Sequence, residues 1–108
     1  MGLLFWKDNK KIDRFALAVA DDLYSYVQPD VALQHVLGRG EASKKKQARI
    51  EQKFTDIRLQ IKRFSEAESL GVYGKARLQK QFNDRLAELG YHIDVVNRIT
   101  ENFLLGNV

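Results

Sequence analysis

The chain contains one long amphipathic pattern, at residues 43–69, that limits what it can fold into. Its large apolar residues are separated by four, three, four and three positions: Ile50, Phe54, Ile57, Ile61 and Phe64. Side chains three and four residues apart lie on the same face of an α-helix. This spacing therefore predicts one long helix with a single apolar stripe and a polar, largely basic remainder.

The stripe has two interpretations, the core face of a helical bundle and a coiled-coil seam between two chains. Five positions cover barely two heptads, whereas a coiled coil needs at least about three. Two of the five residues are phenylalanines, which suit a globular core better than a tight dimer seam. We therefore expect the stripe to form the core of its own chain.

Four other segments have the apolar spacing of helices: 9–27, 30–37, 74–89 and 93–105. Asp8 or Asn9 is a candidate N-cap for the first segment, and Pro29 separates it from the second. Three glycines are placed to end the helices that precede them: Gly38, Gly71 and Gly90. Alternation of apolar and polar residues is scarce, so we expect no sheet.

These segments predict an all-α fold, a single-domain bundle of four to five helices that spans residues 1–108. The short turn at 71–74 should fold the third and fourth helices into a long antiparallel hairpin, around which the bundle is built. Residues 1–8 form an apolar N-terminal segment outside the predicted helices. Residues 38–42 are expected to be a flexible, glycine-rich loop between helices.

Several classes of protein are not favoured by the sequence. The absence of cysteine excludes disulfides and cysteine nucleophiles. No apolar run approaches the roughly 20 residues that span a bilayer, and residues 1–6 do not match a secretory signal. We expect a cytoplasmic protein, and binding to a membrane surface is not favoured.

No catalytic or metal-binding pattern emerges from the titratable residues. His35 and His92 lie in separate segments without the spacing of paired metal ligands. Asp21 and Asp22 are adjacent, so on a helix they point in different directions and do not form a close carboxylate pair. The sequence predicts a protein that is not an enzyme, with no cofactor, no metal and no small-molecule substrate.

Positive charge is concentrated in one part of the chain. Residues 39–64 contain nine Lys or Arg and three acidic residues, whereas the whole chain has a net charge of only +4. An anionic partner would explain this asymmetry, but so would pairing with the acidic residues of the first helix, Asp13, Asp21 and Asp22. The candidates for contact with an anionic partner are Lys44, Lys45, Lys46 and Arg49.

Large apolar residues also occur where a bundle core does not require them. Leu59 points away from the stripe of the long helix. The N-terminal segment contains four consecutive candidates for apolar anchors: Leu3, Leu4, Phe5 and Trp6. They either pack on the bundle itself or dock on a partner, and large aromatic residues often dominate binding at interfaces.

Together these features predict a non-enzymatic protein–protein interaction module, that is, a small adaptor, assembly factor or regulator. Its partner is another protein or a second copy of the chain in a homodimer. The alternative is a nucleic-acid-binding regulator that uses the basic segment 39–63 for phosphate contacts. Phosphate binding by several basic side chains weakens steeply with salt, whereas apolar docking does not.

Overall fold

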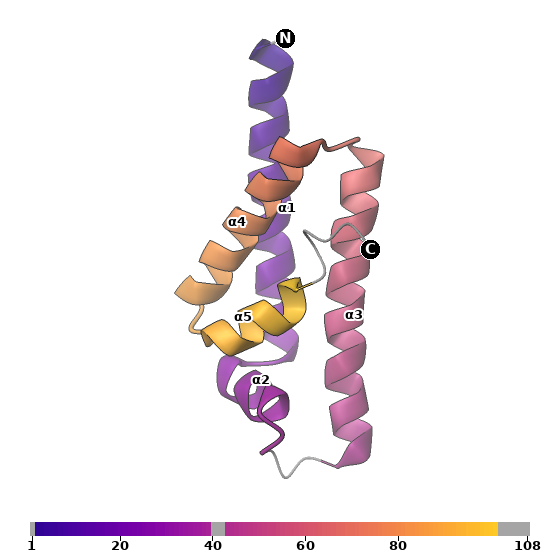
Figure 1. The fold of residues 1–108 in the computed structure, drawn as a ribbon, viewed down its shortest axis with the longest axis vertical. Helices are drawn as coiled ribbons and strands as arrows, with labels where there is room; N and C mark the ends of the chain where they lie inside the picture. The colour runs from indigo at the N-terminus through magenta and orange to yellow at the C-terminus, as the bar shows by residue number, and fades with distance from the viewer. Residues whose placement is uncertain (1, 40–42, 102–108) are drawn as a thin grey trace.

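A computed structural model describes the backbone of residues 2–39 and 43–101, and the side chains of residues 9–39 and 43–101. Within these residues the chain forms five helices and no strand. The helices are α1 (Gly2–Tyr26), α2 (Pro29–Val36), α3 (Lys44–Ala67), α4 (Val72–Glu88) and α5 (Ile93–Thr100). The predicted fold class, an all-α helical bundle, is confirmed (Figure 1).

Helix α1 packs against both of the other long helices, α3 and α4, and most extensively against α4. Two contacts between them, and a third just beyond their ends, join residues that are each 64 positions apart: Asp13 with Arg77, Asp21 with Arg85, and Val27 with Tyr91. This constant offset means that α1 and α4, which continues into the turn at Tyr91, run parallel. Helix α3 runs antiparallel to both, and α5 crosses in front of α1 (Figure 1).

The apolar stripe of α3 lies in the core of its own chain. Ile50, Phe54, Ile57 and Ile61 are buried. Phe64 is partly buried, and its ring stacks on Phe15 of α1 with centroids 4.0 Å apart. This burial confirms the expected intramolecular core and leaves the stripe unable to form a dimer seam.

Helix ends follow the sequence signals at most positions. Ser43 caps α3, because its side-chain oxygen accepts a hydrogen bond from the backbone N–H of Lys46 at 3.2 Å. Gly38 and Gly90 follow α2 and α4 with positive φ values of 68° and 99°, the left-handed conformation that favours glycine at this position.

The end of α3 differs from the prediction, because Ser69 rather than Gly71 takes the left-handed conformation, with φ 52°. The N–H of Leu70 bonds the carbonyl of Ser65, and the N–H of Ser69 bonds the carbonyl of Glu66. This is the pattern of a Schellman cap, and it places Leu70 against the core. Gly71 instead lies at the N-cap of α4.

Helix α1 begins at Gly2 and not near Asn9. No proline or glycine interrupts residues 3–26, so nothing in the sequence forces a break at the predicted cap. The first turns of α1 extend past the turn between α3 and α4 (Figure 1). The predicted loop residues 40–42, and the predicted extension of the last helix beyond residue 101, lie outside the described residues.

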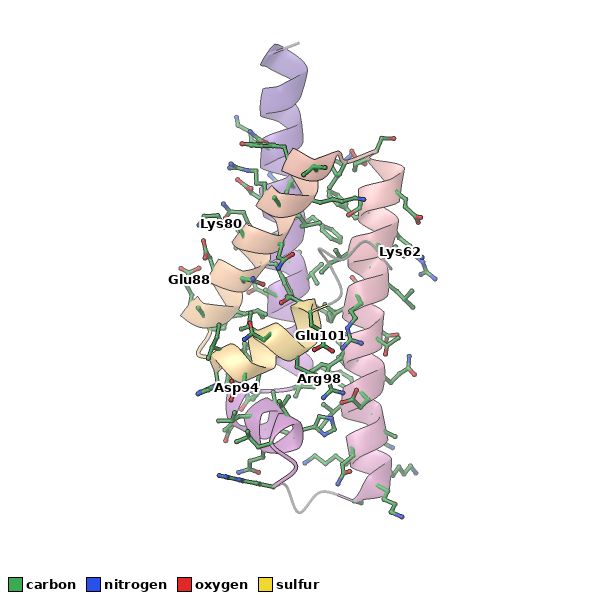
Figure 2. The ribbon with its side chains drawn as sticks, in the orientation of Figure 1. Lys62, Lys80, Glu88, Asp94, Arg98 and Glu101 are labelled. Atoms are coloured by element: carbon green, nitrogen blue, oxygen red, sulfur yellow. The ribbon has the colours of Figure 1, made fainter. Side chains whose placement is uncertain are left out.

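A polar cluster joins three helices at the lower part of the bundle. Glu51 of α3 accepts one hydrogen bond from Arg98 of α5 at 3.0 Å and pairs with His35 of α2. Arg58 of α3 donates to the backbone carbonyls of Arg98 and Ile99, and a cation is favourable at a helix C-terminus. These contacts fix α2 and α5 against α3. Figure 2 shows Arg98 between α5 and α3.

We predict that Ser69→Gly raises the free energy of unfolding by about 0.5–1 kcal/mol, because glycine adopts the left-handed conformation without the steric cost of a Cβ. Urea unfolding followed by circular dichroism measures this change. Ser25→Gly is the control, since Ser25 lies in the last turn of α1 with right-handed helical backbone and glycine there should not raise stability. If both substitutions raised the free energy of unfolding, or both lowered it, the conformational explanation would be contradicted.

Candidate functional site

A groove of about 430 Å³ lies where the end of α1 and the first turn of α2 face the start of α3. Its volume is in the range of sites that hold a small ligand or a few side chains. The residues that line it are Tyr26, Val27, Val31, Ser43, Lys45, Lys46, Arg49 and Ile50.

Two local features of the sequence hold the apolar side of the groove in place. Pro29 begins α2 after a break of two residues that follows α1, and this break folds Val31 back beside the end of α1. Tyr91, at the turn before α5, donates its hydroxyl hydrogen to the backbone carbonyl of Val27. Burial raises the pKa of Tyr91, so the hydroxyl stays protonated and remains a donor.

The groove has an apolar floor and an exposed aromatic wall. Val27 and Ile50 are buried beneath it, whereas Tyr26 is 58% exposed. The ammonium of Lys53 lies 5.1 Å from the centroid of the Tyr26 ring, a cation–π contact. Lys53 in turn pairs with Asp22 at 2.8 Å. The ring therefore has a fixed neighbour on α3.

The cations of the groove are not neutralised by any acidic residue whose side chain the structure describes. Within the residues that the structure describes, no ion pair is formed by the predicted candidates Lys44, Lys45, Lys46 and Arg49. Other cations are paired, for example Arg77 with Asp13 and Arg85 with Asp21. Hydrogen bonding to Asp13 raises the pKa of Arg77.

The described acidic side chains of α1, Asp13, Asp21 and Asp22, therefore do not neutralise the start of α3, a possibility that the sequence had left open. Asp13 and Asp21 pair with α4, and only Asp22 pairs with the basic segment, at Lys53. Arg58 is also occupied, by the carbonyls at the end of α5. The cations in the first turns of α3 therefore have no acidic partner among the described residues.

The start of α3 is electrostatically unfavourable in the free protein. Its first turn contains lysines and no acidic residue. The N-terminus of a helix carries a partial positive charge, which favours anions and disfavours cations. Lys45 and Arg49 are also four residues apart, so their like charges lie close together on one face. An anionic ligand would relieve both effects.

The structure brings together only some of the predicted contact residues. Lys45, Lys46 and Arg49 line the groove, whereas Lys44 is exposed beside it. Leu59 is 38% exposed and lies ten residues beyond Arg49, about 15 Å along the helix axis. It therefore does not belong to the groove.

The predicted anchors Leu3, Leu4, Phe5 and Trp6 have side chains that lie outside the described residues. The backbone of α1 begins at the end of the bundle opposite the groove (Figure 1). The apolar segment and the basic cluster therefore do not form one composite site.

The apolar lining of the groove was not predicted from the sequence; it consists of Tyr26, Val27 and Val31. The sequence does contain one signal for this lining, because a large aromatic side chain, Tyr26, stands just before the helix break at Pro29. That signal does not show which part of the chain the ring faces.

The described residues contain no group of three or more His, Cys, Asp or Glu side chains that is placed to hold a metal ion. None of the helices, as far as they are described, is long and apolar enough to cross a membrane. Comparisons of the chain with protein-family models, with curated proteins and with solved structures gave no match.

We predict that Lys44→Glu raises the free energy of unfolding by about 0.5–1 kcal/mol at low salt, because a carboxylate replaces a cation at the N-terminus of α3. The gain should shrink as salt screens the charges. Lys62→Glu, an exposed position nearer the other end of α3 (Figure 2), should give no such gain. Equal gains in both variants would attribute the effect to the net charge and not to the helix end.

Proposed function

We propose that this chain is a non-enzymatic protein–protein interaction module, an adaptor, assembly factor or regulator that binds an acidic segment of another protein in the groove at the start of α3. One observation carries the proposal: three unpaired cations, Lys45, Lys46 and Arg49, meet in a concave site that also has apolar walls. Charges that no described residue neutralises are available for a partner.

The setting of these cations favours attraction of an anionic partner. A concave site lined by charges of one sign focuses the field and raises the rate at which oppositely charged partners associate. Arg49 adds a planar guanidinium that binds a carboxylate through two parallel hydrogen bonds. The positive end of α3 points into the same region.

A short acidic protein segment fits this arrangement better than a nucleic acid does. Phosphate binding uses a row of cations along a groove or helix. On α3 that row is interrupted, because Lys53 and Arg58 are engaged within the fold. The next unpaired cation, Lys62, lies about 20 Å beyond Arg49 along the axis and points away from the bundle (Figure 2). The positive charge that is available to a partner is therefore confined to the start of α3.

Three elements of the proposal rest on the sequence alone. The apolar residues 3–6 stay a prediction for a second contact surface at the opposite end of α1. A cytoplasmic location and self-association also stay predictions.

A binding assay tests the proposal directly. A fluorescein-labelled peptide of alternating glutamate and serine is titrated with the full chain, and fluorescence anisotropy gives the dissociation constant. We expect binding that weakens as salt rises from about 50 to about 200 mM. Replacing two cations, Lys45→Glu together with Arg49→Glu, should weaken binding at least about tenfold, because two attractive contacts become repulsive.

The matched control reverses the same number of charges on the same helix outside the groove. Lys62→Glu with Arg63→Glu should leave peptide affinity within about twofold of the unmodified chain, apart from the long-range effect of net charge. If both double variants lose affinity equally, the groove is not the binding site. Tighter binding of a single-stranded oligonucleotide than of the peptide would favour the nucleic-acid alternative instead.

A further inference from the structure

The two sides of the groove have different chemistry, and an acidic ligand alone would satisfy only one of them. Helix α3 contributes the cations, whereas the end of α1 and the start of α2 contribute Tyr26, Val27 and Val31. A segment made only of carboxylates would leave the aromatic and aliphatic side in contact with water. An apolar side chain beside the carboxylates would cover it.

Tyr26 is the residue best placed to receive such a side chain. It is 58% exposed, although it borders the buried core residues Val27 and Ile50 at the floor of the groove. Tyrosine presents a large apolar face and has few rotatable bonds, so little conformational entropy is lost when it is covered.

The Tyr26 ring is also held in position before any ligand arrives. The ammonium of Lys53 sits 5.1 Å from the ring centroid, and the carboxylate of Asp22 holds that ammonium at 2.8 Å. The side chain of Lys53 is only 14% exposed, so solvent has little access to the cation in this contact. A preorganised wall reduces the cost of ordering on binding.

We infer that the groove selects an acidic protein segment carrying one aliphatic or aromatic anchor residue, and that Tyr26 determines this preference. The carboxylates of the segment contact Lys45 and Arg49, and the anchor lies against Tyr26, Val31 and Ile50. This inference rests on the proposed function, because it requires an acidic segment to occupy the groove. It adds the apolar contact to the electrostatic contact that the proposed function already requires.

Two peptides that differ at one residue test the inference. The first is the glutamate–serine peptide with a central leucine, and the second has serine in place of that leucine. With the unmodified chain, we expect the leucine peptide to bind about tenfold more tightly, as burial of one leucine side chain allows. The difference should persist at high salt, where binding of both peptides is weaker.

Tyr26→Ala should reduce the preference for leucine to about twofold or less, while the affinity for the serine peptide stays unchanged because the cations remain. Retained binding of the serine peptide also shows that the variant is folded. Tyr73→Ala is the matched control, since Tyr73 is 54% exposed and lies in α4 at the other end of the bundle (Figure 1). It should keep the full preference.

The outcomes separate this inference from the proposed function. Equal affinity for the two peptides, still dependent on Lys45 and Arg49, would overturn the anchor and leave the acidic-segment function standing. A leucine preference that survives Tyr26→Ala would overturn the role of Tyr26. No binding of either peptide at low salt would overturn the proposed function and the inference together.

Discussion

The position of α1 between α3 and α4 is the constraint on which the rest of the structure depends. Ala16 and Ala20 are completely buried in α1, and such small residues let neighbouring helices approach closely. Because α1 also carries acidic residues, its packing decides which cations are neutralised. Two of these acids pair with α4 and Asp22 pairs with Lys53. The start of α3 receives none of the three, and this leaves the cations of the groove without an acidic partner among the described residues.

Much of the fold could be predicted because its signals are local. The spacing of apolar residues located α3 and its buried face, and Ser43 and Gly38 mark helix ends through conformational preferences of single residues. The end of α3 could not be predicted in the same way. Which residue takes the left-handed conformation depends on where Leu70 meets the core, so Ser69 ends the helix although glycine follows at Gly71.

The candidate site was predicted only in part, for a related reason. Lys45, Lys46 and Arg49 are visible in the sequence as a cluster of charge on one segment. Whether that charge is neutralised depends on distant acids, and the parallel register of α1 and α4 that draws Asp21 to Arg85 has no local signature. Tyr26 likewise becomes part of the site only because the bundle places the end of α1 beside the start of α3.

The central claim is that the unpaired cations and the fixed aromatic wall form one binding site, and a nuclear magnetic resonance titration tests it most directly. The ¹⁵N-labelled chain is titrated with the leucine-containing acidic peptide, and amide shifts are followed residue by residue. The account predicts that the largest shifts cluster at Tyr26, Val31, Lys45 and Arg49, on three different helices. Saturable shifts centred on Lys62 and the outer side of α3, or on α4 and α5, would contradict it.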